Sequence, residues 1–289
     1  MEFTNSNQIK SYLKKESERT GISLVNCYNT FFARNLLQRI SELSYGQIIV
    51  KGSFSQMVHL GEMIRPVTDI DLVSTTLDKN EALIVLFRAM YTDNENDIIY
   101  DLSTIPKTTK TGIIKIRTVA KFDKICHPMI IDFNPISKGV LETQYKDVPR
   151  IFSNDKRFYI NTPSHEEHLA EKLCIVSESV KTDVLNTRIK DFYDIYKLHG
   201  GNYDVEKFSY YYGLLLSKRN KISPDVVSSD YLNKDFIDKH RDLWGAMSKK
   251  YEFLDKNVSI DEAVYYTKGV LSEQIQKMKV HKYPVSSIK

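Results

Sequence analysis

Polar residues in the first quarter of the chain follow an order that suits phosphate and metal chemistry. Gly52 and Ser53 follow a short apolar run, and Asp69 and Asp71 come sixteen and eighteen residues after the serine. A glycine lets the backbone approach a phosphate closely, and the hydroxyl and N–H of a serine bind its oxygens. Two carboxylates repel each other unless a cation lies between them, and carboxylates combined with phosphates suit Mg²⁺. The pattern predicts a site for a phosphorylated ligand and its metal ion.

Two strands and a helix must position these residues. Residues 48–50 predict a buried strand, residues 54–60 a helix, and residues 69–73 a second strand. A helix that begins beside the serine brings its N-terminus to the phosphate. Because side chains alternate along a strand, both aspartates share one face. Gly-Ser alone and Asp-x-Asp alone are common in turns, so the combination carries the prediction.

Three more residues complete the predicted site in the first half. Arg65 and Thr68 precede the aspartates, where Pro66 stiffens the loop and the arginine can pair with phosphate in a fork geometry. Asp132 stands alone in the apolar run 129–133. A lone buried carboxylate is costly unless it is paired or near a metal. We therefore interpret Asp132 as a third metal ligand. An alternative of comparable weight is that Asp132 caps a turn at the end of the strand.

The chain after residue 162 predicts helices. The first begins at Pro163 and Ser164, where proline suits a first helical turn and serine forms a capping box with Glu167. Lys172 lies at the edge of the apolar stripe of this helix. Such a lysine either extends to water or binds a triphosphate as a point charge.

A second helix is predicted from about residue 186 to residue 199, ahead of two glycines. A spacing of 100° per residue places Arg188 and Asp191 on its half-buried face. Its solvent-facing side carries three charged residues: Lys190, Asp194 and Lys197. The simplest interpretation is an ion pair between Arg188 and Asp191. Alternatively, a partly desolvated Asp191 orients Lys172 or accepts a proton from an attacking hydroxyl.

Composition sets outer limits on the class of protein. The 289 residues are 42% hydrophobic and 27% charged, as in ordinary globular proteins, and the net charge of +4 permits a nucleic-acid partner without requiring one. Residues 268–289 hold five lysines and one glutamate, a solvated basic tail or a phosphate-binding patch. The three cysteines form no Cys-x-x-Cys pair, and neither a signal-peptide pattern nor an apolar run of membrane-spanning length occurs. We expect a cytoplasmic protein without a membrane partner.

Two parts are expected along the chain. The first, residues 1–150, combines a helical N-terminal extension with a mixed α/β section, which adds a helix at 80–90 and strands at 113–118 and 129–133. The second, residues 151–289, is a helical domain that contributes to the active site. The fold class is therefore α+β.

These motifs, in this order, resemble the nucleotidyltransferase toxins of the AbiEii/AbiGii group, which include the mycobacterial MenT toxins. The resemblance covers most of the chain. Its segments are residues 29–43, Lys51-Gly52-Ser53, residues 65–72, Ile131-Asp132, residues 168–173 and residues 188–195. Many relatives carry a second glycine where this chain has Ser53, and serine matches the wider nucleotidyltransferase pattern.

The resemblance implies a polymerase-β-like nucleotidyltransferase domain and a Mg²⁺-dependent enzyme. Asp69, Asp71 and Asp132 would bind the ion. The nucleotide-binding residues would be Gly52, Ser53, Arg65, Thr68, Lys172 and Arg188, and the catalytic residues Asp71, Lys172 and Asp191. Relatives are toxins of toxin–antitoxin or abortive-infection systems, and several add nucleotides to the 3′ acceptor end of tRNA. The expected partners are a nucleoside triphosphate, RNA (a tRNA first of all) and a cognate antitoxin encoded nearby.

Two alternatives keep part of this prediction. The same fold can transfer a nucleotide to a protein side chain or to a small molecule, and the modest net charge is compatible with either acceptor. A non-catalytic nucleotide-binding module is the third hypothesis. The presence of every expected polar residue counts against it.

Overall fold

The computed structural model describes residues 3–91, 97–135, 140, 142–179, 188–220, 227–251 and 254–280. The chain forms two compact units, residues 1–163 and residues 164–289. The first unit extends past the boundary expected at residue 150 because strand β8 (Tyr159–Pro163) pairs with β1 (Ile48–Val50) in its sheet.

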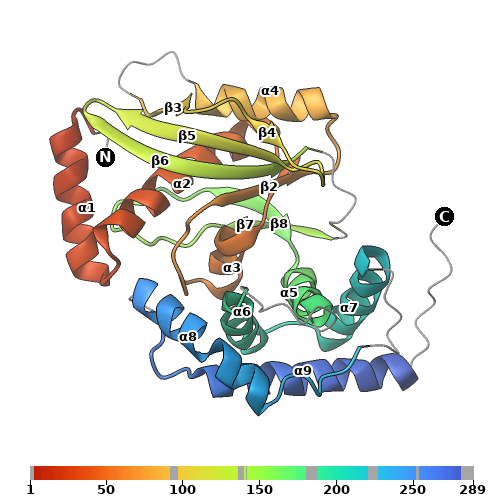
Figure 1. Ribbon diagram of the computed structural model, residues 1–289. Coiled ribbons are helices and arrows are strands. Elements are labelled where there is room, and N and C mark those ends of the chain that lie inside the picture. Colours follow the sequence, from red (N-terminus) through yellow and green to blue (C-terminus); the bar gives the residue numbers. More distant parts are fainter. Residues whose placement is uncertain are drawn as a thin grey trace. The chain divides into compact units, whose positions relative to one another are not determined.

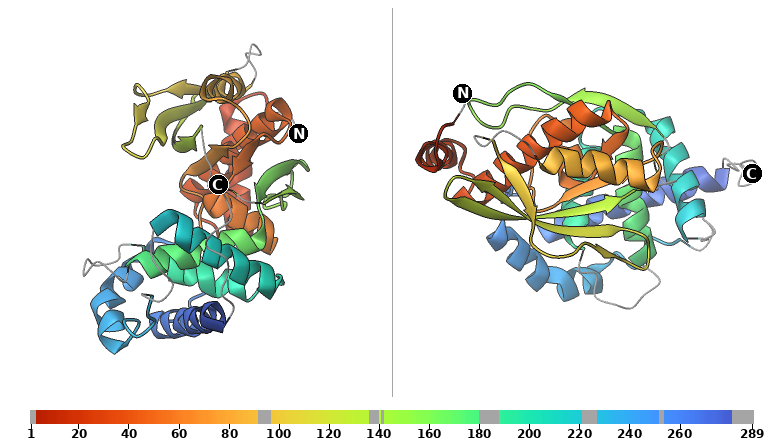
Figure 2. Two further views of the ribbon diagram at one scale, coloured as in Figure 1. Left: turned by 90° about the vertical axis from the view of Figure 1, so that its right-hand side faces the viewer. Right: turned by 90° about the horizontal axis from the view of Figure 1, so that it is seen from above.

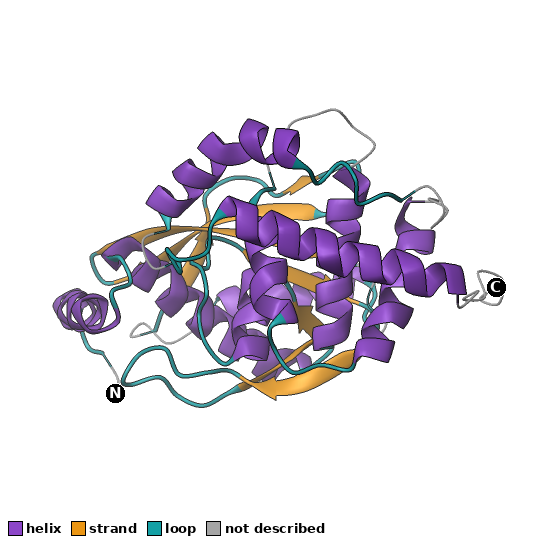
Figure 3. Ribbon diagram, turned by 90° about the horizontal axis from the view of Figure 1, so that it is seen from below, coloured by secondary structure: helices purple, strands orange, loops and turns teal. Residues whose placement is uncertain are grey.

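The first unit is built on a mixed sheet of eight strands in the order β3-β5-β6-β2-β1-β8-β7, with β4 paired to β5 (Figure 1). Figure 3 shows the strands in orange. The remaining strands are β2 (Ile70–Ser74), β3 (Ile99–Leu102), β4 (Lys107–Thr108), β5 (Ile114–Phe122), β6 (Ile125–Asn134) and β7 (Thr143–Asp147). Strand β2 runs parallel to β6 and antiparallel to β1. The strands that carry the predicted acids therefore lie next to each other.

Four helices belong to this unit: α1 (Ser6–Thr20), α2 (Leu24–Ser44), α3 (Gly52–Leu60) and α4 (Lys79–Met90). Helices α2 and α4 pack against each other over the sheet, as the right-hand view of Figure 2 shows. The core includes Phe32, Leu36 and Phe133, each 0% exposed. Burying one such side chain stabilises the fold by about 1.5–3 kcal/mol.

The described part of the second unit contains helices and no strand. Its helices are α5 (His165–Ser179), α6 (Lys190–His199), α7 (Val205–Asn220), α8 (Lys234–Lys250) and α9 (Ile260–Val280). Helix α5 packs on α6 and α7, and α6 also packs on α9. None of the helices in the described ranges is long and apolar enough to cross a membrane.

The predicted α+β class, with a mixed sheet followed by helices, is confirmed. The predicted helix start at Pro163 is wrong, since Pro163 ends β8 and α5 begins at His165. Ser164 does cap α5, because its hydroxyl accepts the backbone N–H of Glu167 at 3.2 Å. The second predicted helix begins at Lys190, and the expected start at 186–187 lies outside the described residues.

Candidate active site

Gly52 and Asp71 lie against each other in the predicted site. Gly52 is the first residue of α3 and has φ +65°, a left-handed conformation that favours glycine. A β-carbon on residue 52 would lie 1.9 Å from Oδ2 of Asp71. The N–H of Lys51 also donates to the carbonyl of Asp71 at 2.8 Å. Only glycine therefore lets this carboxylate lie against the start of α3.

Ser53 adds features that favour an anion. Its side chain is buried, and its hydroxyl has no hydrogen-bond partner among the residues that the structure describes. The residue before the helix, Lys51, makes no side-chain cap to the first turn of α3. The N-terminal N–H groups of a helix carry partial positive charge. A buried hydroxyl at such a terminus is suited to a phosphate oxygen.

Asp71 and Asp132 are neighbours across the sheet. They lie opposite each other in the parallel pairing of β2 with β6, so their side chains share one face. Asp132 accepts Lys115 Nζ on Oδ2 at 3.2 Å, whereas its buried Oδ1 has no hydrogen-bond partner in the described part of the chain. Asp132 is thus neither fully buried nor alone, because a lysine on β5 compensates its charge.

Asp69 and Thr68 lie just before β2. The Thr68 hydroxyl donates to Oδ1 of Asp69 at 3.1 Å. Asp69 and Asp71 are both half-buried, while Ile70 and Leu72 are buried, so the predicted alternation is confirmed. Arg65 lies in the loop from α3 to β2 and is only 5% exposed. The loop therefore keeps this guanidinium out of bulk water.

The residues present fit a divalent cation shared with a nucleotide. Among the described residues, no three His, Cys, Asp or Glu side chains gather closely enough to hold a metal ion by themselves. Mg²⁺ in nucleotide sites usually takes one or two carboxylates together with phosphate oxygens. Asp71 and Asp132 supply adjacent carboxylates, and the orphaned Oδ1 of Asp132 is an acceptor suited to a cation.

In the second unit, Lys172 on α5 binds two aspartates of α6. Its Nζ donates to Oδ1 of Asp191 at 2.8 Å and to Oδ2 of Asp194 at 2.9 Å, and both aspartates are fully buried. Arg188 Nε completes the cluster at 2.7 Å from Oδ2 of Asp191, which confirms the predicted ion pair. The two cations and two anions balance, as burial requires.

The predicted solvent exposure of Asp194 is wrong. Helix α6 packs against α5 on one side and α9 on another, so it has no wide solvent-facing side. Asp194 is 0% exposed, and its carboxylate binds Lys172. Arg188, expected on a half-buried helical face, instead lies in the turn before α6 with 49% of its side chain exposed. The spacing of 100° per residue describes one helix by itself, so it could not predict the burial of Asp194 against Lys172 of another helix.

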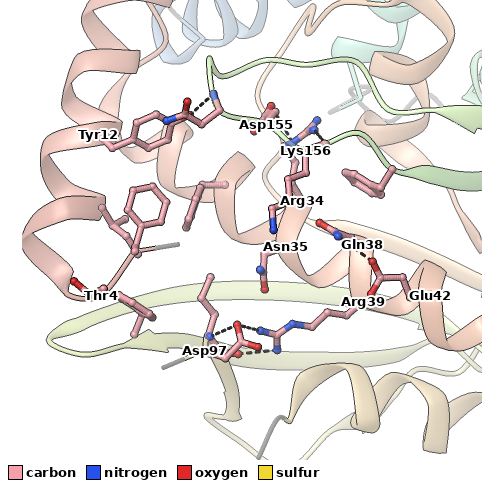
Figure 4. Close-up of a pocket in the computed structure, with 17 residues that line it drawn as sticks. Thr4, Tyr12, Arg34, Asn35, Gln38, Arg39, Glu42, Asp97, Asp155 and Lys156 are labelled. Atoms are coloured by element: carbon pink, nitrogen blue, oxygen red, sulfur yellow. Dashed lines mark hydrogen bonds and ion pairs between the residues drawn. The ribbon is translucent and has the colours of Figure 1, made fainter. Parts of the chain in front are cut away.

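A separate cavity of about 580 Å³ lies in the first unit and contains none of the predicted site residues. It is lined by α1, α2 and neighbouring segments, and Figure 4 shows several of its polar groups paired with one another. Arg34 pairs with Asp155 at 3.0 Å, and Arg39 pairs with Asp97 at 2.6 Å. The positive charges of both arginines are therefore already balanced by aspartates within the cavity wall.

Comparison with solved structures gives several matches of low identity. JHP933 from Helicobacter pylori is 12% identical with a TM-score of 0.52, covering 92% of this chain and 98% of its own. A putative nucleotidyltransferase from H. pylori is 14% identical with a TM-score of 0.44, covering 88% and 96%. An antigenic nucleotidyltransferase-like protein from Paracoccidioides brasiliensis is 12% identical with a TM-score of 0.37, covering 65% and 88%. At these identities the first match supports the fold alone.

Among curated proteins, no match was found. The family described as nucleotidyl transferase AbiEii toxin, type IV toxin–antitoxin system, matches residues 35–265. That range contains every residue of the two clusters described above, from Gly52 to Asp194. The chain therefore belongs to the AbiEii family of nucleotidyltransferase toxins.

Proposed function

We propose that the protein transfers a nucleotide from a nucleoside triphosphate to the 3′-OH of RNA, with the acceptor end of tRNA as its target. The observation that carries the proposal is the contact between Gly52 and Asp71, since it brings a phosphate-binding helix start and a carboxylate together. Membership of a nucleotidyltransferase toxin family supports the transfer reaction. The RNA acceptor rests on the resemblance to relatives that modify tRNA.

The first unit supplies the groups that bind phosphate and metal. Gly52 and Ser53 hold the β- and γ-phosphates, and Arg65 and Thr68 assist them. Asp69 and Asp71 would hold Mg²⁺, with Asp132 as a third carboxylate. When bound, this ion offsets the negative charge of the phosphates and stabilises the attacking and leaving oxygens.

The second unit supplies a buried cation. We assign Lys172 to the triphosphate because the family resemblance implies that role, and Asp191 and Asp194 hold its ammonium group in place. Both oxygens of Asp191 already face cations, Lys172 and Arg188. That arrangement favours Asp191 as a positioning residue over Asp191 as a general base. Arg188 is the remaining candidate for a nucleotide contact.

The reaction is a displacement at the α-phosphorus. The 3′ oxygen of the acceptor forms a bond to that phosphorus, the bond to the bridging β-phosphate oxygen breaks, and pyrophosphate leaves while the hydroxyl proton is lost to a base. Positioning and charge stabilisation account for most of the catalysis in such transfers. In the cytoplasm, where tRNA is available, modified acceptor ends would stop growth until an antitoxin, encoded nearby, counteracts the protein.

The acceptor is tested with each of the four labelled nucleoside triphosphates and Mg²⁺. The wild type and Asp71→Asn are incubated with total RNA, with RNA-free protein lysate and with a small-molecule fraction. We expect label at RNA 3′ ends with the wild type alone. Label in protein or in small molecules would support the alternative acceptors, and no label in any fraction would support a non-catalytic module.

A further inference from the structure

A row of charged residues crosses four neighbouring strands of the sheet. Asp71 on β2 lies opposite Asp132 on β6, Asp132 lies opposite Lys115 on β5, and Lys115 lies opposite Lys107 on β4. Residues that face each other across paired strands project from the same side of a sheet. The 3.2 Å ion pair between Lys115 and Asp132 places these two side chains on that shared side. The row therefore changes from acidic at β2 and β6 to basic at β5 and β4.

The basic end of the row is exposed. Strand β5 alternates between buried and outward residues, and Lys115 and Arg117 are both outward. Neither Arg117 nor Lys107 forms an ion pair with any residue that the structure describes. Ile130 lies opposite Arg117 and is 43% exposed, so an apolar side chain lies beside this cation. Two such cations beside an exposed apolar group suit a strand of nucleic acid, which offers phosphates and base faces.

The direction of the reaction connects this surface to the carboxylates. The strand order places β1, which leads into Gly52, on one side of β2, and β6 and β5 on the other side. In a phosphoryl-type displacement the attacking and leaving oxygens lie roughly in line on opposite sides of the phosphorus. If pyrophosphate leaves at Gly52 and Ser53, the attacking hydroxyl approaches from the β6 and β5 side. The exposed cations lie on that side.

We propose that the basic end of this row, Lys107 and Lys115, together with Arg117 two residues further along β5, binds the phosphates of the acceptor RNA strand and directs its 3′ end to Asp132. These three residues are called the basic row below. Neighbouring strands lie about 4.8 Å apart, so the row extends about 10 Å from Asp132 and contacts only the terminal part of the RNA. Ile130 contacts a terminal base. This inference rests on the proposed function, because it assigns the acceptor route of the same site.

The test compares two double charge reversals with the same change in net charge. Lys107→Glu with Arg117→Glu alters the basic row, whereas Lys10→Glu with Lys14→Glu alters two exposed lysines of α1. Binding of a fluorescent RNA oligonucleotide is measured by anisotropy at several salt concentrations, nucleotide binding by calorimetry, and transfer by steady-state kinetics. Melting curves test whether both variants fold.

For the basic-row variant we expect RNA affinity at least 10-fold weaker than that of the α1 variant, with unchanged nucleotide affinity. The slope of log K against log salt should fall by about 1.4, from two lost phosphate contacts at about 0.7 each for a single strand. RNA affinity and KM within twofold of the α1 variant would overturn the inference.

The two proposals fail in different ways. A wild type that labels protein and not RNA overturns the proposed function, and a wild type that labels RNA while the basic-row variant binds it normally overturns only the acceptor route. If the wild type binds RNA without modifying it, anisotropy still decides whether the basic row is the binding surface.

Discussion

The carboxylate of Asp71 fills the space in which any other residue at position 52 would place its β-carbon. That atom would be 1.9 Å from Oδ2 and 2.9 Å from Cγ of Asp71. The glycine is required twice, once for the backbone at φ +65° and once for this approach. The two requirements can be separated experimentally, because the same helix ends at a second glycine of similar conformation.

Gly52→Ala should therefore lower nucleotide transfer strongly. The new methyl group displaces Asp71 or the start of α3, and a displacement near 1 Å at a reacting centre can cost about 10²-fold in rate. Steady-state transfer assays on the purified variant measure this loss, with melting curves to follow its stability.

Gly61→Ala is the matched control. Gly61 has φ +74°, and a β-carbon added there would have no atom of the described chain within 4 Å, so this variant suffers the backbone strain without the clash. We expect a stability loss of about 1–2 kcal/mol and transfer within twofold of the wild type. Equal activity losses in both variants would mean that strain, and not the contact with Asp71, explains the effect.

Local patterns in the sequence were sufficient for part of this site. A glycine after an apolar run and an alternation of acids with Ile70 and Leu72 are properties of neighbouring residues, and the strands β1 and β2 appear where these patterns place them. The family resemblance follows from the same segments and is confirmed.

The remainder depends on contacts between distant segments. The ion pair of Lys115 with Asp132 requires the register of the β5–β6 hairpin, whose two-residue turn includes Asp123 at φ +48° without the usual glycine signal. The burial of Asp194 requires α6 to pack on both α5 and α9. Neither register nor packing partner can be calculated from the periodicity of a single segment.

Replacing the Asp71 carboxylate tests the metal assignment. Asp71→Asn keeps the size of the side chain but removes the charge that would bind Mg²⁺. Loss of an outer-sphere partner of a metal typically costs about 10–100-fold, so loss of a ligand should cost more than about 10²-fold in transfer. The decrease is measured at saturating nucleotide over a range of Mg²⁺ concentrations.

Asp101→Asn is its control on the same sheet. Asp101 lies on β3 and pairs with Lys121 at 2.6 Å, with 39% of its side chain exposed. Its loss should leave transfer nearly unchanged, since exposed ion pairs contribute at most about 1 kcal/mol. A fully active Asp71→Asn protein would remove Asp71 from the site.

Acidification should destabilise the first unit through His127. This ring stacks on Tyr28 and Phe32, and its Nε2 lies 2.6 Å from Oδ1 of Asn29. Burial lowers the pKa of His127 below its usual 6.5. The unfolded chain then binds the proton more readily, so stability is fully present above pH 6.5 and decreases as the pH falls toward the folded pKa.

His127→Gln isolates this effect, because the amide can still donate to Asn29 and does not titrate. Between pH 7.5 and 5.5 we expect the melting temperature of the variant to fall less than that of the wild type. One proton contributes at most about 1.4 kcal/mol per pH unit. His199 also has a pKa lowered by burial, so part of the dependence should remain. Identical pH profiles for the two proteins would exclude His127 as a contributor.

Removing Lys172 should destabilise the second unit. Lys172→Met keeps the length of the side chain but leaves Asp191 and Asp194 buried without the ammonium that binds both. Breaking a buried ion pair by removing one partner costs about 3–5 kcal/mol. Trp244 is the only tryptophan of the chain and contacts Tyr193 of α6, so its fluorescence during urea unfolding reports on this unit.

Lys197→Met, on helix α6 of the same unit, provides the comparison. Lys197 binds Asp255 at 3.0 Å, with 24% and 38% of the two side chains exposed, and its loss should cost at most about 1 kcal/mol. Asp191→Asn and Asp194→Asn should each weaken the unit and should do so to a similar extent, since each aspartate makes one short bond to Lys172. If Asp194→Asn left stability and activity unchanged while Asp191→Asn abolished activity, Asp194 would have no share in holding the lysine, and Asp191 alone would position it.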